Sequence, residues 1–127
     1  MKDRPLLVGV VGPCAAGKTT LITGLKRCGV LCRHIAQEHS YVPDMWARIT
    51  HPDLLVYLHV SYPLTIERRR MDWTIKEYEE QLFRLRHARQ LADLTIDTDH
   101  LTPQEVFEKV IDFVGKNDEP ATKLDNP

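Results

Sequence analysis

Apolar positions along the chain alternate between short continuous runs and longer stretches with helical spacing. The first run, residues 6–11, is rich in valine and predicts a strand covered on both faces. From Lys18 onward the apolar residues lie three or four positions apart, up to Gly29, which suits a helix end. The chain therefore opens with a strand, a glycine-containing loop and a helix.

The same alternation continues to residue 115. Further apolar runs predict strands at 30–36, 54–60 and 94–96, and helical spacing predicts helices at 43–49, 61–70, 75–92 and 103–115. An alternation of this kind predicts an α/β fold of three layers, in which helices cover a mostly parallel sheet of about four strands. We expect one domain over residues 1–115 and a disordered tail over 116–127.

Two helix starts carry capping boxes. Thr74 with Glu77, and Thr102 with Glu105, have the spacing in which each side chain bonds the other residue's backbone N–H. Pro103 suits the first helical position of the second one. Apolar residues behind Thr74 form one stripe, so this helix is expected to be the longest: Ile75, Tyr78, Leu82, Leu85, Ala88 and Ala92.

Composition narrows the function classes. With 17 Lys and Arg against 18 Asp and Glu, the net charge of −1 provides no general attraction for nucleic acid, and no apolar run is long enough to span a membrane. Three cysteines predict small buried thiols in a reducing, cytoplasmic compartment. A zinc site built from Cys28, Cys32, His34 and His39 is disfavoured, because the spacing is not that of a zinc finger or ribbon.

Residues 12–19, Gly-Pro-Cys-Ala-Ala-Gly-Lys-Thr, fit the P-loop pattern G-x-x-x-x-G-K-[ST] between a predicted strand and a predicted helix. The glycines allow backbone N–H groups to point at phosphates, Lys18 supplies a cation, and the Thr19 hydroxyl is expected to bind Mg²⁺. A secretory signal is disfavoured, because cleavage after Ala16 would destroy this loop. The predicted nucleotide-binding set is Gly12, Pro13, Cys14, Ala15, Ala16, Gly17, Lys18, Thr19 and Thr20.

Phosphate transfer also needs an acid near the metal and positive charge on the transferred group. Glu38 is the acid that directly follows an early strand, and we expect it to act as base or as a ligand to metal-bound water, against the alternative of an exposed loop carboxylate. Gln37 and His39 flank it and either contact an acceptor or lie in a solvated loop.

Two arginine groups are candidates for closing over the phosphates. Arg68, Arg69 and Arg70 precede the long predicted helix, and Arg84, Arg86 and Arg89 lie within it. The alternative is a solvated helix surface paired with nearby glutamates. We expect at least one of these arginines to meet the nucleotide, and Arg68 and Arg69 are the preferred catalytic candidates alongside Lys18 and Glu38.

With these residues in place, the chain resembles the P-loop kinases that act on nucleosides, nucleotides and small molecules. Beyond the loop, residues 53–60 leading into 67–69 and residues 93–98 leading into 101–106 look like the late strands of that group. The resemblance implies a P-loop NTPase-like domain that binds ATP and Mg²⁺, with backbone near 98–100 against the base. The chain would be a minimal member, because only residues 29–52 are available where the group inserts an acceptor-binding segment.

Three functions remain open. The first is a kinase that transfers the γ-phosphate to a small acceptor held by residues 38–46. The second is an ATP-binding or slowly hydrolysing regulatory module that acts with a protein partner, and the third is a nucleotide binder without turnover. Trp46 could line the acceptor pocket but is expected to lie in the core. A GTPase-like Thr-Lys-Leu-Asp stretch at 122–125 is disfavoured, because no strand precedes it.

Overall fold

The computed structural model of the chain describes residues 5–69 and 72–118. Its sheet has four strands, all parallel, in the order β2-β1-β3-β4. The predictions of an α/β fold and a mostly parallel sheet of about four strands are therefore confirmed. The strands are β1 (Val8–Val11), β2 (Cys32–His34), β3 (Leu54–His59) and β4 (Leu94–Asp97).

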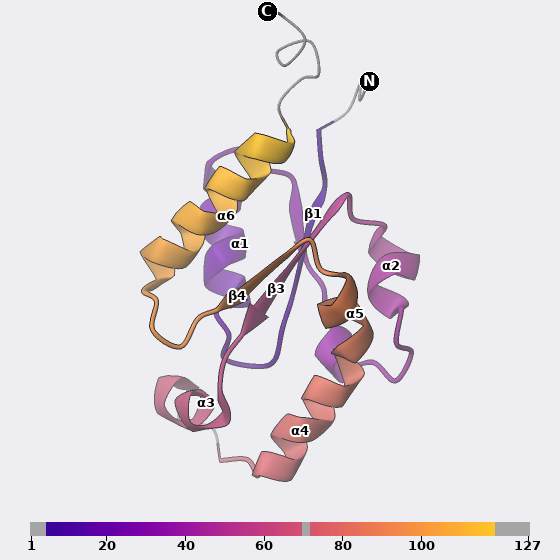
Figure 1. Cartoon of the computed structure of the whole chain (residues 1–127), viewed down its shortest axis with the longest axis vertical. Coiled ribbons are helices and arrows are strands. Elements are labelled where there is room, and N and C mark those ends of the chain that lie inside the picture. The colour runs from indigo at the N-terminus through magenta and orange to yellow at the C-terminus, as the bar shows by residue number, and fades with distance from the viewer. Residues whose placement is uncertain (1–4, 70–71, 119–127) are drawn as a thin grey trace, which may run out of the picture.

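Helices cover both faces of this sheet. In Figure 1 the sheet is seen close to edge-on, with α1 and α6 on one side and α2, α4 and α5 on the other, while α3 lies beyond the carboxyl ends of the strands. The described helices are α1 (Lys18–Arg27), α2 (Met45–Thr50), α3 (Tyr62–Arg69), α4 (Ile75–Arg84), α5 (Arg86–Leu91) and α6 (Pro103–Asn117), with a short 3-10 turn η1 (Gln37–His39).

Alternation along β3 divides the core into two clusters. Leu54, Val56 and Leu58 pack with residues of α1 and α6, whereas Leu55 and Tyr57 pack with residues of α2, α5 and the α4–α5 junction. Successive side chains of a strand point to opposite faces, so a central strand with helices on both sides is apolar throughout. This explains the continuous apolar run in the sequence.

Both predicted capping boxes are present. Thr74 accepts from the Glu77 backbone and Thr102 from the Glu105 backbone, and each glutamate side chain bonds the backbone N–H of its threonine. Pro103 occupies the first turn of α6. These local signals place the starts of α4 and α6 correctly.

The expectation of one longest helix behind Thr74 is wrong. The helix stops at Arg84 and resumes at Arg86, so that α6, with 15 residues, is longer than α4, with 10. Leu85, with φ −92° and ψ −4°, lies between the two helices, and Leu85 and Ala88 both pack in the core cluster that contains Leu55 and Tyr57 of β3. Ile75, expected in the buried stripe, is 54% exposed.

The end of the folded region also differs from expectation. Helix α6 continues through Asn117, so residues 116 and 117, assigned to a tail, are helical. The predicted tail from residue 119 onward, including 122–125, lies outside the described residues. Arg70, expected at the end of the helix over 61–70, also lies outside them. Among the helices that the structure does describe, none combines the length and the hydropathy needed to cross a membrane.

Candidate functional site

The loop joining β1 to α1, residues 12–19, is called the glycine loop below. Three of its residues have positive φ: Gly12 (155°), Ala15 (70°) and Gly17 (95°). A Cβ on Gly12 would lie 2.2 Å from the Leu58 carbonyl oxygen of β3, so only glycine fits there. Gly17 precedes α1 in a left-handed conformation that glycine adopts without strain. The sequence spacing therefore reflects real backbone requirements.

Lys18 is held inside this loop. Its side chain is 6% exposed, and its Nζ donates to the carbonyl oxygens of Gly12 at 2.5 Å and Pro13 at 3.1 Å. The Nζ also lies 3.1 Å from Glu38 Oε2. A buried ammonium is tolerated because it is both paired and hydrogen-bonded.

Glu38 reaches Lys18 because β2 lies directly beside β1. Beyond β2, the Ile35 backbone N–H still bonds the Val10 carbonyl, and η1 then turns Glu38 inward, where it is 3% exposed. The Arg84 guanidinium donates to the Glu38 carbonyl at 3.3 Å and so fixes η1 from helix α4. The prediction that this acid belongs with the loop agrees with the geometry, and the exposed-carboxylate alternative is wrong.

One oxygen of the Glu38 carboxylate lacks a hydrogen-bond partner among the described residues. This oxygen, Oε1, is buried. The other oxygen serves Lys18 and lies 3.7 Å from His39 Nε2. Each unpaired buried polar atom costs free energy, so an orphaned carboxylate oxygen at a cavity wall indicates room for a cation or donor.

A cavity of about 370 Å³ opens in front of the loop. Thr19 and Thr20 are exposed to it, so the threonine predicted to bind Mg²⁺ lies at the same cavity as Glu38. The lining includes most of the predicted nucleotide-binding set together with residues from β2, η1 and α3: Cys14, Ala15, Ala16, Gly17, Lys18, Thr19, Thr20, His34, Glu38, His39 and Arg69.

A second cavity, of about 430 Å³, adjoins the first. Arg68 and Arg69 line it together with apolar residues from the loop, α1 and the start of α6, and Arg69 lines both cavities. Arg68 donates to the Thr98 hydroxyl at 2.9 Å and the Thr98 carbonyl at 2.6 Å. The two cavities share wall residues, and their combined lining is polar at the Glu38 end and more apolar beside α6.

The second arginine group lies elsewhere. Arg84 bonds Glu80 and the Tyr41 hydroxyl, Arg86 stacks on the Phe83 ring at 3.8 Å, and Arg89 lies 5.4 Å above the Tyr57 ring. None of the three lines either cavity. Of the two groups, the one from α3 is therefore beside the glycine loop.

Gln37 neither lines the first cavity nor lies in a solvated loop, so both the acceptor contact and the solvated position expected for it are wrong. It is fully buried and donates to the Val42 and Arg84 carbonyls, while its Oε1 accepts from the Trp46 backbone N–H. Trp46 is 9% exposed and donates through its indole to His87, so its prediction as a core residue is confirmed. Residues 38–46 are therefore tied down by their own polar groups.

Gln81 was not foreseen. It lies 6% exposed on α4, accepts from the Cys14 backbone N–H at 3.0 Å and donates to Cys14 Sγ at 3.2 Å. This contact joins α4 to the glycine loop. The one sequence signal was a polar residue between apolar positions of an amphipathic helix, which usually indicates a surface residue.

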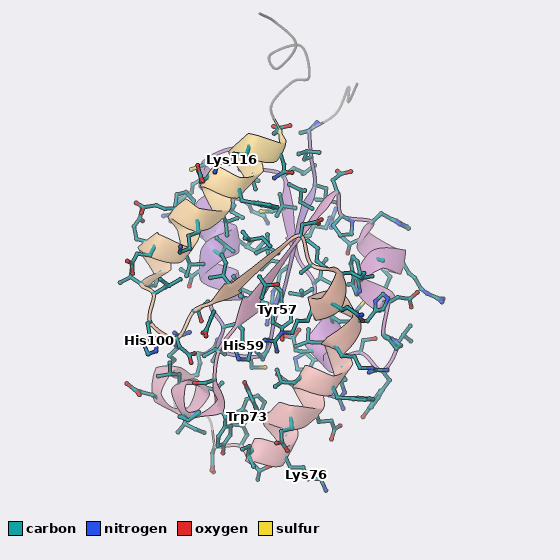
Figure 2. The ribbon with its side chains drawn as sticks, viewed as in Figure 1. Tyr57, His59, Trp73, Lys76, His100 and Lys116 are labelled. Atoms are coloured by element: carbon teal, nitrogen blue, oxygen red, sulfur yellow. The ribbon has the colours of Figure 1, made fainter. Side chains whose placement is uncertain are left out.

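Two aromatic groups, one buried and one half-buried, lie on the α4–α5 side of the sheet. Tyr57 and His59 follow each other along that face of β3, with ring centroids 6.4 Å apart (Figure 2). Burial lowers the pKa of His59, and Arg89 lowers it further; burial raises the pKa of Tyr57 to about 12. Burial and the charge of Lys18 also lower the pKa of His34 in the first cavity.

The cysteines differ from the expected pattern of small buried thiols. Cys32 is buried, whereas Cys28 is exposed and Cys14 is partly exposed at the cavity. Within residues 5–69 and 72–118, the group that places three potential metal ligands together is Cys14, Glu38 and His39, rather than the four residues considered from spacing. The cytoplasmic location inferred from cysteine content stays a prediction.

Comparison with known proteins adds no assignment. No protein-family model matches the chain, and no curated protein matches it.

Proposed function

We propose that this chain binds ATP with Mg²⁺ through a P-loop and transfers the γ-phosphate to a small acceptor. The observation that carries the proposal is the position of Lys18, which is buried at the floor of the glycine loop and paired with Glu38 at 3.1 Å. A motif match by chance would not place an acid from a distant segment, the turn η1, on the motif lysine. The pairing brings a cation and an acid together at one point.

The residues present fit a metal-bound triphosphate. Positive φ at three loop positions and the start of α1 directed at the loop create an anion-binding concavity. Lys18 would turn from the Gly12 and Pro13 carbonyls to phosphate oxygens, and Thr19 with Glu38 would hold Mg²⁺ directly or through water. Bound Mg²⁺ would neutralise part of the phosphate charge; the other tasks belong to side chains of the protein.

The second cavity suits the nucleoside end. Its more apolar wall is formed by Leu21, Leu101 and Val106, and Arg68, which also lines it, is held by hydrogen bonds to Thr98. A planar base is largely apolar on its faces, so it gains most from a site of this kind. Arg69, which lines both cavities, is placed to neutralise charge between phosphates and acceptor.

The acceptor side has little room. Gln37 and Trp46 hold residues 38–46 in place, so the groups that remain for an acceptor are His34, His39 and the Glu38 carboxylate at the first cavity. We therefore propose a compact acceptor with one hydroxyl or phosphate group. Glu38 would accept its proton or orient it, as the orphaned Oε1 permits.

A regulatory module that works with a partner protein is the alternative, and one observation favours it. Tyr41 and Phe83, 82% and 62% exposed, flank a separate cavity of about 250 Å³ that Arg84 also lines. Because Arg84 also bonds the Glu38 carbonyl, a protein bound over these rings would act directly on the position of the acid.

Calorimetric titration with MgATP tests the binding step. Lys18→Ala should weaken binding severely, whereas Lys26→Ala, which removes an exposed lysine from the last turn of the same helix, should not. Thr19→Ala should weaken binding with Mg²⁺ more than without it. Equal affinities of the folded Lys18→Ala variant and the wild type would contradict the proposal.

A screen for acceptor-dependent ADP release separates the two functions. A kinase should release ADP faster with one of a set of nucleosides, nucleotides and small hydroxy acids than with water alone, and Glu38→Gln should lower turnover far more than ATP affinity. If no acceptor raises the rate but a co-purified protein does, the regulatory alternative is correct.

A further inference from the structure

Three different ligand types meet at one wall of the first cavity. Cys14 belongs to the glycine loop, and Glu38 and His39 belong to η1 after β2. One ligand atom from each lies within 4.8 Å of the others. Thiol, carboxylate and imidazole together are the donors that zinc uses in proteins, whereas Mg²⁺ binds oxygen ligands and does not favour sulfur.

The group has features that a chance cluster lacks. Glu38 is 3% exposed, and its Oε1 has no hydrogen-bond partner in the described part of the chain. Cys14 Sγ accepts from Gln81 Nε2 at 3.2 Å, a hydrogen bond that fixes the direction of the sulfur. The buried acid and the oriented sulfur are thus already in place.

The third ligand can adjust. Around a tetrahedral zinc with ligand bonds of about 2.0–2.3 Å, ligand atoms lie roughly 3.3–3.8 Å apart. His39 Nε2 already lies 3.7 Å from Glu38 Oε2, and the ligand atoms of the group all lie within 4.8 Å of one another, so the site needs a contraction of at most about an ångström. The His39 side chain is 61% exposed, so its ring has room to rotate toward the ion.

We propose that Cys14, Glu38 and His39 bind one divalent zinc ion, with a fourth position open to water in the cavity. Binding forms a sulfur–metal bond and releases the thiol proton to solvent, while the carboxylate and neutral imidazole bind without oxidation or reduction. This proposal does not rest on the proposed nucleotide function, because zinc binding requires no phosphate.

Lys18 sets the strength of this site. Its Nζ lies 3.1 Å from Glu38 Oε2, so the ion and the ammonium compete for one carboxylate. Lys18 retains its bonds to the Gly12 and Pro13 carbonyls when zinc takes the acid. Zinc and the magnesium nucleotide would likewise both need the Glu38 carboxylate, so each opposes binding of the other.

Cobalt(II) titration of the reduced full chain tests which thiol binds. The wild type should show a thiolate-to-cobalt charge-transfer band, Cys14→Ser should lose it, and Cys28→Ser, which removes an exposed thiol outside the group, should retain it. A band absent from the wild type, or one that follows Cys28 instead of Cys14, would overturn the proposal.

Zinc calorimetry tests the other ligands. His39→Asn should weaken zinc binding by more than about tenfold, and His51→Asn should not, although both replace exposed histidines and Asn tolerates the positive φ at His51. Lys18→Met should tighten zinc binding while weakening MgATP binding. Weaker zinc binding in this variant would refute the shared carboxylate, and a chain that binds zinc but not MgATP would leave this site standing while refuting the proposed function.

Discussion

The two faces of the sheet are built differently. On the α1 and α6 side, buried residues are almost all aliphatic, with Val8, Leu25 and Val110 at the centre. On the α2, α4 and α5 side, the smaller cluster contains Trp46 and Tyr57 and borders buried Gln37, Glu38 and Gln81. The first face is held by packing, and the second combines packing with buried hydrogen bonds. Glu38 and Gln81, which contact the glycine loop, border the second face, whereas the apolar wall of the second cavity comes from the first face: Leu21, Leu101 and Val106.

The difference between the two faces shows which contacts hold a side chain in a precise position. Aliphatic packing tolerates small shifts, whereas a buried polar group must meet its partner at hydrogen-bond distance or lose free energy. A face that must aim Glu38 at Lys18 therefore carries more polar anchors than one that only excludes water.

The largest effect on stability is expected on the packed face. Leu25→Ala removes a fully buried side chain of α1 and should lower the free energy of unfolding by about 2–5 kcal/mol. Urea unfolding followed by circular dichroism measures it. Loss of less than about 1 kcal/mol would mean that this face collapses around the cavity and is not tightly packed.

A smaller but more local effect is expected for Gln37→Leu. The substitution removes the acceptor of the Trp46 backbone N–H and one donor to each of the Val42 and Arg84 carbonyls, at a cost of about 1–3 kcal/mol. Trp46 fluorescence should change before global unfolding, because η1 and α2 loosen first. A single transition identical by fluorescence and circular dichroism would show that the second face does not loosen separately.

Tyr57→Phe should have the opposite sign. The Tyr57 hydroxyl is buried without a partner in the part of the chain that the structure describes, so its removal should raise stability by about 1 kcal/mol. The pKa of about 12, above the ordinary 10.0, means that wild-type stability falls once the pH rises past 10. This alkaline loss should shrink in the variant, as urea midpoints at several pH values would reveal; a destabilised variant would imply a partner for the hydroxyl.

The smallest expected effect is on the loss of stability at acidic pH. Burial and Arg89 lower the pKa of His59 below 6.5, so the unfolded chain takes up its proton first and stability declines as the pH falls through 6.5 toward the folded pKa. His59→Gln should flatten the decline measured between about pH 5 and 8, leaving the part due to His34, whose pKa is also lowered. An unchanged slope would show that His59 is protonated without cost.

Local sequence signals predicted the short-range features of both faces well. Valine runs, capping boxes and Gly12 and Gly17 act over a few residues, and they located the strands, the starts of α4 and α6, and the glycine loop. The carboxylate was also found, because polar residues after parallel strands gather at one edge of the sheet.

The second face was predicted less well because its structure depends on distant partners. The break at Leu85 follows from the shape of the core, and a periodic stripe carries no signal for it. Gln37 and Gln81 are polar, and sequence reasoning places such residues at the surface; only their contacts 47 and 67 residues away explain their burial. The role of Arg84 as a support for η1 was hidden for the same reason.

The buried ion pair of Lys18 and Glu38 makes the pocket close to neutral when no ligand is bound. A bare polyanion that draws the Lys18 ammonium toward itself would leave the Glu38 carboxylate buried without a counter-charge, where charges are poorly screened. A polyanion that carries its own cation would supply that counter-charge. If the proposed function is correct, the pocket would therefore favour a polyphosphate that carries a metal ion over a bare one, whatever the shape of the rest of the ligand.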